Sequence, residues 1–322
     1  MSRVRVAVIG GGQNCEHDVS LASANSVAGA LPGDVYDVVT LTIDRDGEWR
    51  DAAGRPLGLG GAVQVLTGCD VALPMVHGPR GEDGTLAALC EFAGVPYVGS
   101  GLDAGALGVN KWATKLVAGA LGIRTASGSP LTPAEAAAFR WTGPVVVKPL
   151  GAGSSHGVTL VAGPDGLAAA FALDDRVLVE EEITGREIDI AVLGGPGGRR
   201  TVSPPLEIVV DGLFDHSTKY GGQADFCVPA VLTGAERASV ERAALAMYDA
   251  LGCRGVARVD FFLTPSGPVL NEVNTVPGFT SESQVPRMFS AVGLSYPDLL
   301  DRLVRDALGS PEFSGPAMPV LR

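Results

Sequence analysis

Short apolar runs of strand length recur along the first third of the chain, and small-residue segments separate them. The runs at residues 4–9, 36–43 and 71–75 predict buried strands, whereas residues 20–30 and 85–93 predict helices. Glycine-rich turns follow the first and third runs. A strand, a glycine-rich turn and a helix open a parallel α/β sheet, with the helix N-terminus free to face an anion. The glycines lack the dinucleotide-binding spacing, so the pattern does not by itself specify that fold.

The middle of the chain predicts a second, smaller α/β unit over residues 111–198 that has the look of a nucleotide-binding module. Its predicted elements lie at residues 111–122, 145–148, 158–161, 166–171, 177–181 and 187–195. The strand that ends in Lys148 runs into a loop of glycine, serine and histidine at 151–157, which suits phosphate binding, although an ordinary hairpin turn has a similar composition. Residues 199–226 are polar and show little periodicity, which predicts a mobile lid.

A predicted hairpin at residues 256–273 holds the densest group of candidate ligands. Because side chains alternate along a strand, Arg258 and Asp260 share one face of its first strand. Glu272 and Asn274 share one face of its second strand. Two carboxylates and an amide oxygen suit Mg²⁺, but a solvated polar face has the same alternation, and spacing leaves both interpretations open. The polar loop that follows suits the binding of an anion by backbone N–H groups.

Two further helices are predicted at residues 234–251 and 296–308. The last residues are rich in proline, glycine and serine and are predicted to be loose. The pattern as a whole divides the chain into units at residues 1–110, 111–198 and 199–309, followed by a tail at 310–322.

Composition narrows the class of protein. The chain has 322 residues, of which 46% are hydrophobic and 19% charged, as in a compact globular protein. Its net charge of −12 argues against nucleic-acid binding, since no long basic block offsets it. Apolar runs stay short of the roughly 20 residues that span a bilayer. The five cysteines are scattered and lack metal-binding spacing, which favours a reducing, cytoplasmic setting.

Other polar residues at turns and strand ends are compatible with both chemistry and ordinary exposure. Lys111 and Lys148 lie where phosphate-binding lysines occur, although a lysine is exposed by default. One acid of the run Glu180–Glu182 suits a ribose hydroxyl, and Glu16, on the first turn, suits a substrate ammonium or a helix-capping role. Lys219 and Tyr220, in the candidate lid, could bring a cation and a phenol over a site, although spacing alone favours surface exposure.

Eight motifs follow one another along the chain: GGGQNCEHDVSLAS (10–23), HGPRGEDG (77–84), YVGS (97–100), NKWATK (110–115), VVVKPLGAGSSHGV (145–158), EEEITGREIDIAVLG (180–194), TKY (218–220) and the segment 257–286. In this order they resemble the D-alanine–D-alanine ligases of the ATP-grasp superfamily, from Arg3 to about Leu308. The resemblance implies a mixed α/β and α+β protein, a three-domain ATP-grasp fold with an N-terminal parallel α/β domain. It also implies that ATP lies between the central and C-terminal domains.

Site residues follow from the resemblance, each by its match to a motif. The nucleotide-binding positions are Lys111, Lys148, Ser154, Ser155, Glu180, Glu181, Ile183 and Glu187. The ligands of two Mg²⁺ ions, for which Mn²⁺ is an alternative, are Asp260, Glu272 and Asn274. The catalytic positions are Glu16, Ser154, Tyr220, Arg258 and the backbone N–H of Gly278. The substrate-binding positions are Glu16, His77, Lys219, Ser283 and Gln284.

The resemblance implies a two-step reaction. The carboxylate of one D-alanine attacks the γ-phosphate of ATP, and the amine of a second D-alanine then displaces phosphate from the acyl phosphate. Such chemistry needs cations on the phosphates, donors at the developing oxyanion and a lid that excludes water. The implied partners are small molecules only, with neither nucleic acid nor membrane, and the family is commonly dimeric.

Departures from the family pattern leave the acceptor open. Asn14, Ala87, Ala88 and His156 replace usual residues, and Glu282 and Gln284 flank Ser283 where His and Leu are common. Gln284 motivates the alternative of a D-alanine–D-Xaa ligase with a more polar acceptor. The presence of Tyr220 favours an amine acceptor. A regulatory protein without catalysis is a third interpretation, but it predicts loss of Arg258 or of the metal ligands, and all four residues are present.

Overall fold

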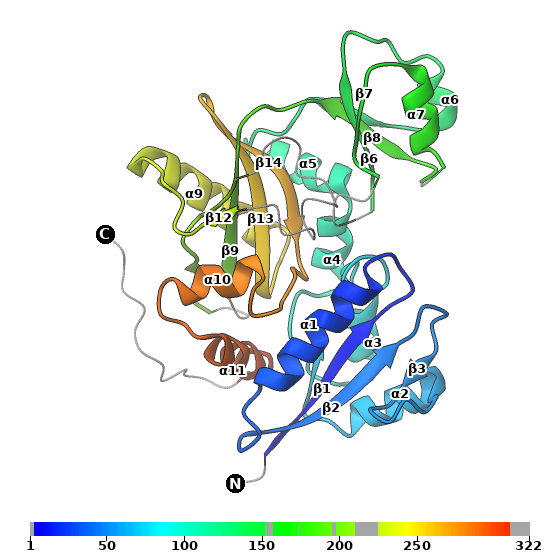
Figure 1. Cartoon of the computed structure of the whole chain (residues 1–322), viewed down its shortest axis with the longest axis vertical. Coiled ribbons are helices and arrows are strands. Elements are labelled where there is room, and N and C mark those ends of the chain that lie inside the picture. The colour runs from blue at the N-terminus through cyan, green and yellow to red at the C-terminus, as the bar shows by residue number, and fades with distance from the viewer. Residues whose placement is uncertain are drawn as a thin grey trace.

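The computed structural model describes residues 3–151, 153, 157–172, 174–194, 198–209 and 225–309. The described strands form three sheets, which occupy the lower, upper and central parts of the molecule in the view of Figure 1. The predicted tail at 310–322 lies outside the described residues. Within the described part of the chain, every helix is too short or too polar to cross a membrane.

The N-terminal sheet has the strand order β3-β2-β1-β4. Its elements are β1 (Val4–Gly11), α1 (His17–Ala30), β2 (Tyr36–Ile43), β3 (Trp49–Arg50), α2 (Gly58–Thr67), β4 (Val71–Pro74) and α3 (Thr85–Phe92). Strands β2 and β4 run parallel to β1, and β3 is an antiparallel edge. Val6 and Val8 face one hydrophobic core while Ala7 and Ile9 face another, which explains the unbroken apolar run. The predicted parallel α/β domain is confirmed.

The small sheet, at the upper right of Figure 1, is antiparallel and has the order β5-β8-β6-β7. Its strands are β5 (Gly128–Leu131), β6 (Val145–Pro149), β7 (Thr159–Val161) and β8 (Val177–Glu181). Helices α6 (Pro133–Ala136) and α7 (Pro164–Ala170) accompany them. Valines of β6 and β8 form its core, and the opposite end of β6 places Lys148 toward the large sheet.

The large sheet, in the centre of Figure 1, has the order β12-β11-β9-β13-β14, and β10 also pairs with β9. Its strands are β9 (Arg186–Gly194), β10 (Thr201–Val202), β11 (Leu206–Val209), β12 (Asp225–Cys227), β13 (Gly255–Thr264) and β14 (Gly267–Asn274). Helix α9 (Gly234–Ala250) packs on β9, β13 and β14, while α4 (Leu102–Val109) and α5 (Lys111–Ala120) contact β14. Helices α10 (Gln284–Ser290) and α11 (Tyr296–Ala307) follow.

Two features of the large sheet differ from the sequence pattern. The candidate lid at 199–226 includes strands β10, β11 and the start of β12. The sequence pattern does not reveal β11, because its buried residues Leu206 and Ile208 alternate with Glu207 over too short a run to give a clear period. Residues 210–224 lie outside the described part. Strand β9, which falls inside the predicted central unit, is hydrogen-bonded to β13 in the large sheet.

Candidate active site

Two neighbouring cavities lie among the three sheets. The lysine-lined cavity, of about 410 Å³, is bordered by Lys111, Lys148 and Glu180. The Glu16 cavity, of about 560 Å³, is bordered by Glu16, His77 and Gly278. Arg258 and Gln284 border both cavities. The two side chains therefore mark the place where a group held in one cavity meets a group held in the other.

A carboxylate between two lysines forms one wall of the lysine-lined cavity. Glu180, at the end of β8, lies 2.7 Å from Lys148 Nζ through one oxygen and 2.6 Å from Lys115 Nζ through the other. All three side chains are buried. Burial alone would raise the pKa of Glu180, but the two ammonium groups outweigh it and hold that pKa below its usual value. Glu180 is therefore an ionised counterion inside the cavity at neutral pH.

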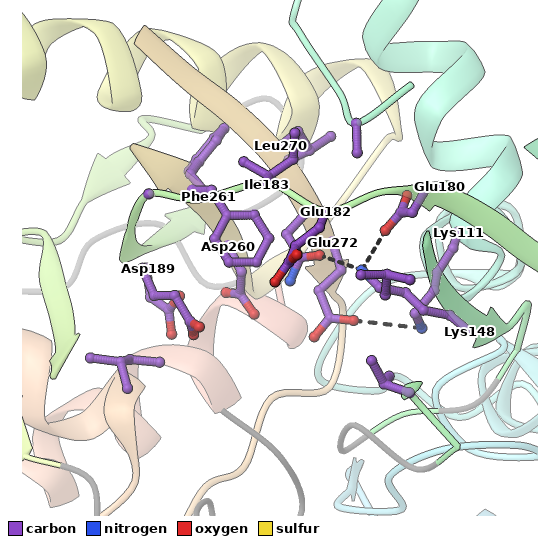
Figure 2. Close-up of a pocket in the computed structure, with 18 of the residues that line it drawn as sticks. Lys111, Lys148, Glu180, Glu182, Ile183, Asp189, Asp260, Phe261, Leu270 and Glu272 are labelled. Carbon is purple, nitrogen blue, oxygen red and sulfur yellow. Dashed lines mark hydrogen bonds and ion pairs between the residues drawn. The ribbon is translucent and has the colours of Figure 1, made fainter. Parts of the chain in front are cut away.

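The lysines of this cavity also reach the large sheet. Lys148 Nζ donates to Asn271 Oδ1 at 2.9 Å, and Lys111 Nζ lies 3.5 Å from Glu272 Oε2. Figure 2 shows these lysines across the cavity from Asp189 and Asp260. A triphosphate between the two walls would have cations on one side and carboxylates, which suit a bridging metal, on the other.

The hairpin of β13 and β14 brings its four polar residues together as the alternation predicts. Arg258 pairs in register with Asn274, and Asp260 pairs with Glu272. Arg258 Nε and Nη2 donate to the two oxygens of Asp260 at 2.7 and 2.8 Å, and Asn274 Nδ2 donates to Asp260 at 2.9 Å. Burial would lower the pKa of Arg258, but the ion pairs with Asp260 and Asp189 raise it above its usual value. Arg258 thus stays a cation in a buried site.

The donor set of this cluster fits a hard divalent cation. Asp260 forms an ion pair with Arg258, and Glu272 forms one with Lys111. Asn274 donates through its amide nitrogen and keeps its oxygen for a ligand role. Among the described residues no three His, Cys, Asp or Glu side chains form a metal cluster. Two carboxylates and an amide leave coordination positions for phosphate oxygens, which is how Mg²⁺ is commonly held beside nucleotides.

Glu16 lies at the meeting point of two glycine-containing segments. A Cβ added at Gly78 or at Gly153 would come within 2.6 Å of Glu16 Oε2, and Gly78 has a left-handed φ of +70°. Position 78 therefore needs glycine for its left-handed backbone, and at both positions glycine lets the backbone approach this carboxylate. Asn14 accepts from the Glu16 backbone N–H at 2.8 Å and donates to the carbonyls of His77 and Pro79 at 2.9 Å. Asn14, a departure from the family pattern, thus joins the glycine-rich turn after β1 to the turn at residues 77–84.

His77 connects the N-terminal domain to the loop after β14. Its Nδ1 lies 2.8 Å from the Val276 carbonyl, and its Nε2 lies 2.9 Å from Ser23 Oγ. Ser23 Oγ also accepts from the Phe279 backbone N–H at 3.2 Å. These bonds hold the loop, including Gly278, at the edge of the Glu16 cavity.

Ser283 and Gln284 lie at the start of α10 and make different contacts. Ser283 Oγ accepts from the Thr280 backbone N–H at 3.0 Å and lies 2.9 Å from Thr280 Oγ1. Gln284 is buried and its Nε2 donates to Asp189 Oδ2 at 2.7 Å. Glu282 is exposed and pairs with Arg287 at 2.6 Å. Both departures beside Ser283 border the Glu16 cavity, but only the side chain of Gln284 is buried.

The buried carboxyl of Glu82 borders the Glu16 cavity. Burial and the nearby charge of Glu16 raise its pKa to about 7, although an N–H from Gly78 and the charge of Lys111 act in the opposite direction. An acid with this pKa is protonated more readily in the folded than in the unfolded chain.

We expect Glu82→Gln to alter the pH dependence of stability. The stabilisation from protonating Glu82 is complete below its ordinary pKa of 4.5 and is lost as pH rises to about 7. At about 1.4 kcal/mol per pKa unit, the loss is on the order of 3 kcal/mol. Glutamine stays neutral and still accepts from Gly78, so its stability relative to wild type should rise from pH 5 to pH 8. Thermal unfolding of both proteins from pH 5 to pH 8 checks this prediction. A stability difference between variant and wild type that does not change with pH would contradict it.

Comparison with known proteins decides the family. The profile for the D-ala D-ala ligase C-terminus matches residues 128–305, and the profile for the D-ala D-ala ligase N-terminus matches residues 5–65 and 52–100. The D-alanine–D-alanine ligase of Mycolicibacterium vanbaalenii is 40% identical over 358 aligned positions, covering 95% of this chain and 98% of the relative. The chain belongs to the D-alanine–D-alanine ligase family.

Solved structures agree with this assignment to the ligase family. The VanG D-Ala:D-Ser ligase of Enterococcus faecalis superposes with a TM-score of 0.82 at 34% identity, covering 95% of this chain and 100% of that one. A D-alanine–D-alanine ligase of Bacillus anthracis complexed with ATP gives a TM-score of 0.78 at 28% identity, covering 95% and 98%. The predicted ATP-grasp fold is confirmed.

Most residues predicted from the ligase motifs gather at the two cavities. Those on the lysine-lined cavity are Lys111, Lys148, Glu180, Glu181, Ile183, Glu187, Asp260 and Glu272. Those on the Glu16 cavity are Glu16, His77, Asn274, Gly278 and Ser283, and both cavities include Arg258 and Gln284. Ser154, Ser155, Lys219 and Tyr220 lie outside the described residues. The roles of all these residues remain predictions.

Three buried groups of this ligase family member did not emerge from the sequence. Lys115 is part of the NKWATK motif, but only the fold shows that it pairs with Glu180. Asp189 shares a strand face with Glu187, a signal that alternation offers in the run Glu-Ile-Asp-Ile. Glu82 lies in the turn HGPRGEDG, whose composition alone predicts an exposed acid.

Proposed function

We propose that this protein joins two D-alanine molecules to D-alanyl-D-alanine, with ATP converted to ADP and phosphate, for the synthesis of a peptidoglycan precursor. One observation carries this proposal. A cavity with lysines suited to binding phosphates and a cavity with a buried carboxylate, Glu16, suited to binding an ammonium meet at Arg258. A ligase that activates a carboxylate with ATP needs this adjacency. The ligase relatives and the ATP complex of the Bacillus anthracis enzyme support it.

ATP would occupy the lysine-lined cavity. Lys111 and Lys148 would bind its phosphates, while Glu180, Glu181, Ile183 and Glu187 would contact its ribose and adenine. Ser154 and Ser155, in the glycine-rich loop, keep their predicted role at the phosphates. Asp260, Glu272 and Asn274 would hold two Mg²⁺ ions, or Mn²⁺, which when bound neutralise phosphate charge.

The first D-alanine would lie in the Glu16 cavity with its ammonium on Glu16. Its carboxylate oxygen would attack the γ-phosphorus, so that a P–O bond to the acyl oxygen forms as the bond to ADP breaks. The amine of the second D-alanine would then attack the acyl carbon, lose a proton and expel phosphate. Arg258 and the Gly278 N–H would stabilise the tetrahedral oxyanion in this step.

The remaining predicted residues would orient the substrates and close the site. Ser154 and Tyr220 would link the first D-alanine to the lid, and Lys219 would approach the transferred phosphate. Ser283 would bind the carboxylate of the second substrate, while His77 would fix the loop that carries Gly278. Exclusion of water is required because an open acyl phosphate would hydrolyse.

We expect the purified protein to release phosphate from ATP only when Mg²⁺ and D-alanine are both present. Mass spectrometry of the product should identify an alanyl-alanine dipeptide, because the carboxylate of Glu16 in this cavity suits the ammonium of an amino acid and the proposed acceptor is a second D-alanine. L-alanine serves as the matched control and should give background release. Phosphate release that does not depend on any D-amino acid would contradict the proposed function.

A second candidate is a D-alanine–D-Xaa ligase, which keeps the chemistry and changes the acceptor. Gln284 favours it, because a buried amide borders the Glu16 cavity where an apolar residue is common in the family. The structural likeness to the VanG D-Ala:D-Ser ligase is compatible with it. A panel of D-amino acids and D-lactate as acceptors separates the two, since use of D-alanine alone rejects the second.

Assembly, location and domain limits are further parts of this proposal. We expect a homodimer with small-molecule partners only. The cysteines are all free thiols, which supports a cytoplasmic location. We keep the division at residues 1–110, 111–198 and 199–309 as a proposal, although strand β9 of the central unit is a strand of the large sheet.

A further inference from the structure

A second carboxylate, Asp189, faces Arg258 from the strand beside β13. Asp189 on β9 lies in register with Asp260 on β13, so the two acids flank the guanidinium. Asp189 Oδ2 lies 3.4 Å from Arg258 Nε, whereas Asp260 accepts from Nε and Nη2 at 2.7 and 2.8 Å. Asp189 is 2% exposed. A carboxylate this deeply buried requires cationic or hydrogen-bonding partners.

The charges of the cluster favour an additional cation. Asp189, Asp260 and Glu272 contribute three negative charges, and Arg258 and Lys111 contribute two positive ones, which leaves a net charge of −1 on these five side chains. In a buried site an excess carboxylate lowers the energy of any cation that enters. Of the three carboxylates, Asp189 is the one that is not a predicted metal ligand.

A divalent cation bound by Asp260 would compete with the donors that its carboxylate already accepts from. Both its oxygens accept from Arg258, and Oδ2 also accepts from Asn274. An oxygen that turns to a divalent cation weakens its bond to the guanidinium. Arg258 then needs another acceptor if it is to keep its direction toward the Glu16 cavity. Asp189 Oδ2 is close enough to supply it with a small movement.

We propose that Asp189 is a positioning residue. It accepts hydrogen bonds from Arg258 when Asp260 binds a divalent cation, and Gln284 holds Asp189 in place. Gln284 Nε2 donates at 2.7 Å to the same Asp189 oxygen that faces Arg258. The inference rests on the proposed function, in which Asp260 binds metal and Arg258 stabilises the oxyanion. It gives Gln284 a role through Asp189 that is independent of acceptor choice.

Removing the charge at position 189 should weaken metal binding. In Asp189→Asn, Asp260 is the remaining carboxylate that forms an ion pair with Arg258 among the described residues, so Arg258 competes more strongly with the metal. We expect the dissociation constant of Mn²⁺ in the presence of ADP, measured from the electron paramagnetic resonance of free Mn²⁺, to rise about tenfold. The Mg²⁺ concentration for half-maximal rate should rise in parallel, with little change in the KM for D-alanine.

Glu207→Gln is the matched control. Glu207 lies on the neighbouring strand β11 and accepts two bonds from Arg186 at 2.7 and 2.6 Å, away from the three predicted metal ligands. This variant should bind Mn²⁺ as wild type does. If Asp189→Asn does not fold, Gln284→Leu keeps every charge and should weaken Mn²⁺ binding in the same direction.

Each outcome decides the inference. Unchanged Mn²⁺ binding in Asp189→Asn, or in Gln284→Leu when the first variant does not fold, overturns it, and so does equal weakening in Glu207→Gln. Failure of the proposed function is seen separately, as wild-type protein that binds Mn²⁺ with ADP but releases no phosphate with D-alanine.

Discussion

Replacing Arg258 with methionine should destabilise the protein by about 3–5 kcal/mol, because Asp260 and Asp189 lose the buried cation between them. Methionine fills most of the volume but supplies neither charge nor donors. In the proposed reaction the same change removes a stabilising donor at the oxyanion, which should lower kcat about 10²- to 10³-fold. Urea unfolding and a coupled assay of ADP release measure the two effects.

Arg186→Met is the control for this prediction. Arg186 also makes a two-bond ion pair, with Glu207, but its side chain is 39% exposed. Solvent screens an exposed pair, so this variant should lose no more than about 1 kcal/mol. If the two variants were equally stable and equally active, the buried cluster would not have the importance that its geometry indicates.

Glu180→Gln should have a comparable effect on stability for the opposite reason. The substitution leaves Lys148 and Lys115 buried without their shared carboxylate, which should destabilise the nucleotide-free protein by about 3–5 kcal/mol at neutral pH. Lys148 also loses its fixed position, so the KM for ATP should rise. Unfolding by urea and initial rates at varied ATP concentration measure these changes.

The sign of the pH dependence separates this effect from a packing defect. The pKa of Glu180 is depressed, so its stabilisation is present above its ordinary value of 4.5 and is lost as pH falls through the lower folded value. The difference between wild type and Glu180→Gln should therefore shrink in acid. Glu182→Gln, at an exposed position of the same acidic run, should change stability by less than about 0.5 kcal/mol. If the stability difference between wild type and Glu180→Gln stayed the same in acid, a packing defect would explain it instead.

The two variants test different parts of the site. Arg258 borders both cavities, whereas Glu180 lies on the wall of the lysine-lined cavity. If both predictions hold, the buried charges of the molecule are organised as two separate ion clusters. Nucleotide and metal would then enter a site in which each charged side chain already has a partner.

The sequence by itself determined many of the local elements and the pairing within the hairpin of β13 and β14. Apolar runs predicted β1, β2 and β4, and alternation predicted that Arg258, Asp260, Glu272 and Asn274 would converge on the hairpin of β13 and β14. These features depend on neighbours within one strand or one turn, which a linear pattern records. The motifs added the family and the positions of the remaining site residues.

Only the tertiary structure decided which charges meet across long separations. Lys115 and Lys148 reach Glu180 from different elements, and Asp189 reaches Arg258 because β9 pairs with β13 rather than with the small sheet. Asn14 joins two turns that are 63 residues apart. Burial, which fixes the energy of each of these charges, is a property of the packed molecule, so residue type and spacing cannot express it.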